Sequence, residues 1–175
     1  MKKITYIFIF IFSFSSFSQD DNVLFDIKFG MTKSEIKKIF KADKEKYTKI
    51  DLGGWLWRYY YQNNGYDENG GLTQIKLNPV GGGLYGLPIT DSRVLFKALL
   101  RVLIKQGYTN DDININSDNP LEFTIGEVYI LSNKEKNRNV YIGLPPMGNN
   151  VYMNLVIGKY VDILEEGTET SNSPF

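Results

Sequence analysis

The sequence contains neither histidine nor cysteine in its 175 residues. Without them, Ser-His-Asp and Cys-His hydrolytic centres, His general bases and the usual zinc sites are all excluded. No disulfide can form, and no cysteine can carry a lipid anchor. Only carboxylates, lysine, tyrosine and Ser-Lys pairs remain as catalytic groups. The composition therefore favours a protein that is not an enzyme and that uses no cofactor.

Long apolar runs are also scarce, and the one that stands out is at the start of the chain. Two lysines precede an apolar stretch from Ile4 to Phe14, and Ser16 and Ser18 supply small residues before a cleavage point ahead of Gln19. This stretch is shorter than the about 20 residues needed to cross a membrane. We expect residues 1–18 to be a secretory signal peptide. The protein is then periplasmic or secreted, with no transmembrane segment after cleavage.

The chain has no excess charge of one sign. Twenty basic and twenty acidic side chains balance, and loss of the leader leaves a net charge of −2. A near-neutral chain is a poor partner for nucleic acid, so we expect none. The one basic run, residues 33–49, holds seven lysines against Glu35, Asp43 and Glu45. It is either a patch for an anionic surface or partner, or a solvated helix face with its loop.

A helix start is visible at Thr32. Thr32 and Glu35 have the spacing of a capping box, in which each side chain bonds a free amide of the first helical turn. Ile36 then begins an apolar stripe typical of one buried helix face. The pattern predicts a helix over residues 33–42.

A second helix is predicted over residues 91–106. Thr90 or Asp91 is the expected N-cap, and Gly107 is placed to end the helix. Its polar side chains recur every fourth residue and therefore lie within one sector of the helix surface. Nearly all the rest of that surface is apolar. We expect a sheet to cover one side of this helix, and the first helix or a partner to cover another.

The last third of the chain reads as three strands, within residues 121–131, 139–144 and 150–161. The expected order is helix, two strands, helix, three strands. This order indicates an α+β fold: two layers, an antiparallel sheet of about five strands with two helices packed on one face. We expect a single domain over residues 22–166 and a disordered polar tail over 167–175.

The first two strands are expected to form an aromatic-rich hairpin. Residues 55–61, WLWRYYY, pair through a DENGG turn with a strand carrying Ile75 and Leu77. If Gly70 forms a bulge, Tyr61 lies near Leu77, and the aromatic rings at alternate positions share a face with the two aliphatic residues. Without the bulge, those aliphatic residues face the other side of the strand. The turn residues favour the bulge.

The aromatic strand has two interpretations. In the first, its rings are buried on the face of the strand that packs against helices. In the second, they form a partly exposed platform for a sugar or another flat ligand. The residues of such a binding face would be Trp55, Trp57, Tyr59 and Tyr60. The core interpretation is favoured because two apolar helices must be covered.

Three further patterns suggest chemistry but fit it poorly. Gly81, Gly83 and Gly86 spell G-x-G-x-x-G, yet Pro88 separates them from the helix, so a flexible link is favoured over a dinucleotide site. Glu122 and Glu127 form the one nameable carboxylate pair for glycoside hydrolysis. A weak calcium site is the third pattern, in which alternate residues match a calcium loop that lacks its glycine and its bidentate glutamate. Its ligands would be Asp112, Asn114, Asn116 and Asp118.

The segment FGMTKSEIKKIF resembles the helix start of small envelope proteins of the BamE/SmpA kind, and is similar to the repeat opening of β-lactamase inhibitory protein. The match is carried by Gly30, Met31, Thr32, Glu35 and Ile36. The resemblance implies a two-layer αβ fold that binds other proteins rather than catalysing a reaction. No binding residue of these families is assigned to this chain by the resemblance. The chain also lacks the lipidated cysteine of the envelope proteins and the disulfides of the inhibitor.

These observations favour an exported, non-enzymatic interaction protein of the bacterial periplasm or exterior with a protein partner. The partner would bind a sheet face or the helix at 91–106. The alternative is a carbohydrate or small-ligand binding module built on Trp55 and Trp57, and a carboxylate hydrolase comes third.

Overall fold

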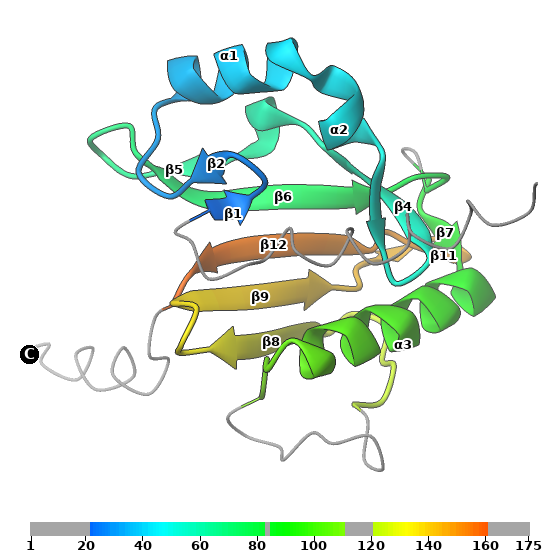
Figure 1. The fold of residues 1–175 in the computed structure, drawn as a ribbon. Coiled ribbons are helices and arrows are strands. Elements are labelled where there is room, and N and C mark those ends of the chain that lie inside the picture. Colours follow the sequence, from blue (N-terminus) through cyan, green and yellow to red (C-terminus); the bar gives the residue numbers. More distant parts are fainter. Residues whose placement is uncertain (1–21, 83–84, 111–120, 161–175) are drawn as a thin grey trace, which may run out of the picture.

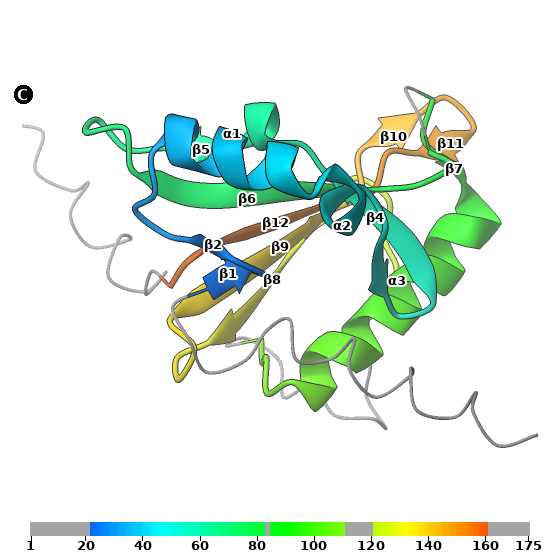
Figure 2. The same ribbon diagram turned by 45° about the horizontal axis from the view of Figure 1, so that its top comes forward.

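The computed structural model describes residues 22–82, 85–110 and 121–160. The expected leader, the polar tail and the calcium candidates all lie outside these ranges. The described part is α+β with antiparallel strands (Figures 1 and 2).

The helices are α1 (Lys33–Ala42), α2 (Lys44–Thr48) and α3 (Ile89–Lys105), with a 3-10 turn at Tyr61–Asn63. The strands before α3 are β1 (Asn22–Leu24), β2 (Ile27–Lys28), β3 (Ile50–Leu52), β4 (Trp55–Tyr59), β5 (Gly65–Tyr66), β6 (Leu72–Pro79) and β7 (Leu87–Pro88). Those after it are β8 (Val128–Asn133), β9 (Arg138–Gly143), β10 (Pro146–Met147), β11 (Asn150–Val151) and β12 (Asn154–Lys159).

The main sheet has seven strands, so the expectation of about five is wrong. Its order is β3-β4-β6-β12-β9-β8, and β5 also pairs with β6. The two extra strands are β3, which turns directly into β4, and β5, which forms after the aromatic strand is interrupted. The last of the described strands, β12, lies between β6 and β9 and joins the two halves of the sheet (Figure 1). Residues from β6, β12 and β9 therefore become neighbours.

Helix α1 begins as the sequence predicts. The carboxylate of Glu35 accepts a hydrogen bond from the Thr32 amide at 2.8 Å, and the Glu35 amide donates to the Thr32 hydroxyl at 3.4 Å. The carboxylate also accepts a hydrogen bond from the Thr32 hydroxyl at 2.7 Å, and the two hydrogen bonds that Thr32 donates lower the pKa of Glu35 below its ordinary value. The helix buries Ile36 and Phe40, and the Phe40 ring lies 6.1 Å from the ring of Tyr59.

Helix α3 begins two residues earlier than expected. Its N-cap is Pro88, so the prediction of Thr90 or Asp91 as the cap is wrong. The physical reason is that β7 runs directly into the helix, which starts where strand pairing ends. The C-terminus agrees with the prediction: the amide of Gly107 bonds the carbonyl of Ile104 at 2.9 Å, and that of Tyr108 bonds Leu103 at 3.0 Å. This pair of bonds is the Schellman motif.

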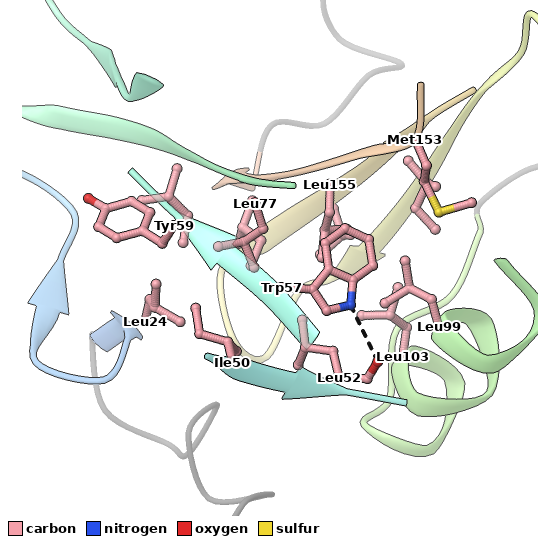
Figure 3. Close-up of a cluster of buried hydrophobic side chains, with 14 of the residues drawn as sticks. Leu24, Ile50, Leu52, Trp57, Tyr59, Leu77, Leu99, Leu103, Met153 and Leu155 are labelled. Carbon is pink, nitrogen blue, oxygen red and sulfur yellow. Dashed lines mark hydrogen bonds between the residues drawn. The ribbon is translucent and has the colours of Figure 1, made fainter. Parts of the chain in front are cut away.

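The apolar surface of α3 is covered from more than one direction. Leu99 and Leu103 face Trp57 of the sheet, as Figure 3 shows. On another side, the ring of Phe96 lies 5.7 Å from Phe123 and 4.7 Å from Tyr129. The segment that contains Phe123 thus packs against α3 together with the sheet, and the expectation that a partner covers part of this helix stays a prediction.

The turn between β5 and β6 has the predicted chemistry. Gly70 has a φ of +79°, and the amide of Asp67 bonds the carbonyl of Gly71 at 2.9 Å, as in a type I turn closed by a glycine bulge. The register differs by two residues, because Tyr59 rather than Tyr61 lies opposite Leu77. The strand ends at Tyr59, and the 3-10 turn begins two residues later, at Tyr61. A shift of two keeps each side chain on its predicted face.

The register divides the sheet into two faces. One face carries the rows Leu77–Leu155–Ile142–Tyr129 and Ile75–Ile157–Val140–Leu131, which belong to the core or pack against it. The opposite face carries Lys76–Val156–Tyr141–Ile130, and these four residues are only partly buried. This second face is where side chains of the sheet remain accessible.

Candidate functional site

The aromatic strand lies mainly in the core. The side chains of Trp57 and Tyr59 are 0% exposed. The indole nitrogen of Trp57 donates to the carbonyl of Leu52 at 3.4 Å, and its ring lies among Leu99, Met153 and Leu155 (Figure 3). Rings buried on all sides cannot stack on a ligand. Of the four predicted binding residues, Trp57 and Tyr59 are thus structural in this conformation.

The other two candidates, Trp55 and Tyr60, are partly buried. Trp55 packs against the core. The outward positions of the same strand are Leu56, which is 46% exposed, and Arg58. The strand therefore presents an aliphatic and a cationic side chain to solvent, together with the accessible parts of Trp55 and Tyr60, and not a continuous aromatic platform.

The glycine pattern and the carboxylate pair do not have the local structure that their motifs require. Gly81 and Gly86 lie before β7, and α3 begins only after Pro88, so among the described residues of the glycine pattern no helix starts. Glu122 and Glu127 are separated by a turn in which the Glu127 amide bonds the carbonyl of Thr124. The strand expected over 121–131 begins only at Val128. Within the described ranges, no group of three acidic side chains is placed to hold a metal ion.

The accessible sheet face contains a hollow that sequence reasoning missed. The hollow has a volume of about 400 Å³, within the range of small-ligand sites. We call its floor and walls the Tyr141 surface. It is formed by Gln74, Gly126, Glu127, Val128, Tyr141, Gly143, Pro145, Asn154 and Val156.

The strand register explains how these residues meet. Tyr141 of β9 lies opposite Val156 of β12, and Gly143 lies opposite both Asn154 of β12 and Val128 of β8. Gly143 has no side chain, and the amide of Asn154 lies over it: a Cβ at Gly143 would be 3.0 Å from Asn154 Oδ1. Eight of the nine lining residues lie within residues 126–156, and only Gln74 of β6 comes from a distant part of the sequence. The available signal was the alternation in VYIGL and NLVIGKY, whose outward residues are neither charged nor uniformly polar.

The chemistry of the Tyr141 surface suits binding. Its side chains include a phenol, two amides from Gln74 and Asn154, aliphatic groups, and the carboxylate of Glu127. On the same face, the Lys76 ammonium lies 5.8 Å from the ring centre of Tyr152, and the Tyr152 hydroxyl donates to the Asn78 amide oxygen at 3.4 Å. Glu122 is not among the lining residues, so the hollow contains only one carboxylate of the pair considered for hydrolysis.

Comparison with known proteins found no matching family model, curated protein or solved structure. The resemblance of residues 29–40 to BamE/SmpA-like proteins and to β-lactamase inhibitory protein therefore stays a prediction. Among the helices that the structure describes, none combines the length and the apolar character that a membrane crossing requires.

Proposed function

We propose that this is an exported, non-enzymatic interaction protein of the bacterial periplasm or exterior, which binds a protein partner through the Tyr141 surface. Two features of the sequence support it: the leader-like residues 1–18, and the lack of histidine and cysteine. Phe40 of α1 and Phe96 of α3 both contact rings on the core face, at Tyr59 and Tyr129. A fold that gathers its helices on one face leaves the other for a partner.

The observation that carries the proposal is apolar exposure beside the hollow. Val128 is 58% exposed and Ile125 is 39% exposed, on the short segment that forms one wall. Clustered exposed apolar side chains with a polar rim mark interaction sites in soluble proteins. The lining offers aliphatic, phenolic and amide groups with a single carboxylate. The partner segment that fits is therefore apolar and uncharged, with backbone amides that can bond Gln74 and Asn154.

The test uses two matched valines. Val128 beside the hollow and Val94 on α3 are 58% and 59% exposed. A photo-crosslinking amino acid is placed at one or the other position, and the protein is irradiated in the exporting cell. We expect an adduct of defined mass from position 128 and none from position 94. Adding Tyr141→Ala should abolish the adduct while the melting temperature stays close to that of the parent.

Adducts in equal amounts from both positions, or none from position 128, would contradict the proposal. An adduct of twice the chain mass would identify the partner as a second copy. The same cells report export directly, because removal of residues 1–18 lowers the mass of the recovered chain and leaves Gln19 as its first residue.

A carbohydrate ligand is the second candidate. Trp57 is buried in the core and is not available to stack on a sugar. The Tyr141 ring, however, lies beside the amides of Gln74 and Asn154, and a ring next to hydrogen-bonding groups suits a sugar. Calorimetric titration with envelope oligosaccharides separates the candidates. Saturable heat that disappears in Tyr141→Ala and survives in Trp55→Ala would favour the sugar, whereas the protein-partner proposal expects no heat.

A further inference from the structure

A second surface, distant in the fold from the Tyr141 surface, is formed by the outer side of α1 and the start of α2. We call it the lysine surface. Its members are Lys33, Lys37, Lys38, Lys41 and Lys44, all of them exposed. Figures 1 and 2 both show α1 on the outside of the molecule, with no other labelled element over it. Its inner side is fixed by buried Ile36 and Phe40, so the lysines are held outward.

The nearby acids are already engaged. Glu35 bonds the amide and the hydroxyl of Thr32, and Asp43 accepts from the Lys46 amide at 3.2 Å. Glu45 pairs with Lys49, and Asp26 pairs with Lys46. Within the described ranges, no ion pair includes a member of the lysine surface. Lys38 interacts electrostatically with the Glu35 carboxylate, whereas the other four ammonium groups face solvent without an ion pair in the described part of the chain.

The spacing of the lysines makes this arrangement unfavourable for the isolated helix. Lys33, Lys37 and Lys41 are four residues apart, so successive ammonium groups lie on one stripe and repel each other. The stripe runs along most of a ten-residue helix, a length of about 15 Å. An anionic surface opposite the stripe would remove this repulsion.

We propose that the lysine surface binds the anionic phosphate headgroups of a phospholipid membrane. Protein interfaces are depleted in lysine and rely on aromatic and arginine anchors, whereas the lysine surface has no arginine and no exposed aromatic ring, and Ala42 is the one exposed apolar residue in α1. Compact ammonium charges suit a diffuse negative surface. Since no apolar side chain is available to insert, the attachment is electrostatic and reversible by salt. The inference shares export with the proposed function but does not depend on the Tyr141 surface.

The experiment uses the chain as recovered from the exporting cell, floated with vesicles of phosphatidylcholine alone or with one third phosphatidylglycerol. We compare Lys37→Gln/Lys41→Gln with the matched pair Lys97→Gln/Arg101→Gln on α3. Both remove two exposed cations and change the net charge equally. Each lysine near an anionic surface contributes about fivefold to partitioning. We therefore expect the first pair to lower partitioning into phosphatidylglycerol vesicles about 25-fold, and the second pair to leave it nearly unchanged.

Binding should vanish on phosphatidylcholine alone and fall steeply as salt is raised. The first pair should also melt at or above the temperature of the parent, because it removes like-charge repulsion and glutamine is a good helix former. Equal losses in the two pairs would show a net-charge effect and overturn the proposal. The proposal would also be overturned if the protein bound soluble poly-glutamate but did not bind phosphatidylglycerol vesicles. That result would indicate that the ligand is an acidic polypeptide. Crosslinking from position 128 tests the Tyr141 surface separately.

Discussion

Trp57 shows how a single position is assigned to the core. Alternation along β4 places it with Tyr59 on the face that carries Ile75 and Leu77, and this part of the site was predictable from the sequence because alternation is a local property. Whether that face would be covered depends on α3, which follows much later in the chain. The sequence therefore left burial and exposure as open alternatives, and the packing of Leu99 and Leu103 against the indole decides for burial.

Replacing Trp57 tests this assignment. We expect Trp57→Ala to lower the free energy of unfolding by about 3–5 kcal/mol, the usual cost of removing a buried aromatic side chain. Trp55→Ala should cost clearly less, because Trp55 is only partly buried. Chemical denaturation measures both changes. In the single-tryptophan variants Trp55→Phe and Trp57→Phe, acrylamide should quench Trp55 and spare Trp57. Equal quenching of the two would contradict the burial of Trp57.

The capping box of α1 gives a pH prediction. The pKa of Glu35 is lowered from its ordinary value of 4.5 by hydrogen bonds from Thr32. A carboxyl with a lowered pKa in the folded state adds stability that is present above pH 4.5 and is lost as pH falls through the folded-state pKa. Glu35→Gln keeps a side chain that can cap but removes the charge. The parent should be more stable than Glu35→Gln at neutral pH, and the difference should shrink below pH 4.5.

Chemical denaturation of both proteins across this range measures the effect. Glu68→Gln is the matched control, since in the described part of the chain the Glu68 carboxylate makes no hydrogen bond and lies at an exposed turn. A stability difference for Glu35→Gln that stays constant from neutral to acid pH would contradict the capping role of the carboxylate. The capping geometry itself was predictable, because all its atoms lie within four consecutive residues.

At the scale of elements, local signals predicted α1 within its exact bounds and the end of α3. They missed the β3–β4 hairpin, although Gly53 and Gly54 between two strands are a hairpin signal. The aromatic run was predicted to pair with the strand that carries Ile75 and Leu77, and it does so as β4 with β6; its second pairing, with β3, was not predicted. The sequence also missed α2, whose five residues are too few for a periodic pattern. Asp43 caps α2 at the point where α1 ends, so the two helices read as one solvated lysine-rich segment.

The Gly53–Gly54 turn offers a prediction with an internal control. Both glycines have positive φ values, of +69° and +81°. A Cβ at Gly53 would lie 3.2 Å from the backbone of Ala98 in α3, whereas one at Gly54 meets nothing within 4 Å. Either substitution by alanine costs about 1–2 kcal/mol for the left-handed backbone. Gly53→Ala should cost more, because the hairpin must also move away from α3. Equal unfolding free energies for Gly53→Ala and Gly54→Ala would contradict the close contact between the hairpin and α3.

At the scale of the whole molecule, one core joins elements from every part of the described chain. Buried residues of β1, α1, β4, α3 and β12 form a single cluster. The class of fold was predictable, because the order of helices and strands follows from local periodicity. The placement of β12 between β6 and β9 was not, because strand order depends on contacts between distant segments. The same placement brings Gln74 of β6 beside the residues of the segment 126–156 that form the rest of the Tyr141 surface.

A single core predicts that disturbing one buried group unfolds the whole molecule. Burial, with the Asp26 carboxylate nearby, raises the pKa of Tyr47 from 10 to about 12, and burial also raises the pKa of Tyr59. A raised folded-state pKa gives stability that is complete below pH 10 and is lost as pH rises toward about 12. Tyr47→Phe removes one of these ionisations, so its unfolding free energy should fall less steeply over that interval. Tyr85→Phe, at a position 78% exposed, is the control.

The measurement is a titration followed by tyrosinate absorbance and by far-ultraviolet circular dichroism on the same samples. Exposed tyrosines such as Tyr85 should ionise first without loss of helix or strand signal. The buried group containing Tyr47 should ionise together with the loss of that signal, because the phenol cannot reach solvent while the core is closed, and coincident transitions are the mark of cooperative unfolding. If all the tyrosinate absorbance developed while the dichroism stayed native, the rings of Tyr47 and Tyr59 would be accessible in the folded protein. The aromatic residues would then again be candidates for ligand binding.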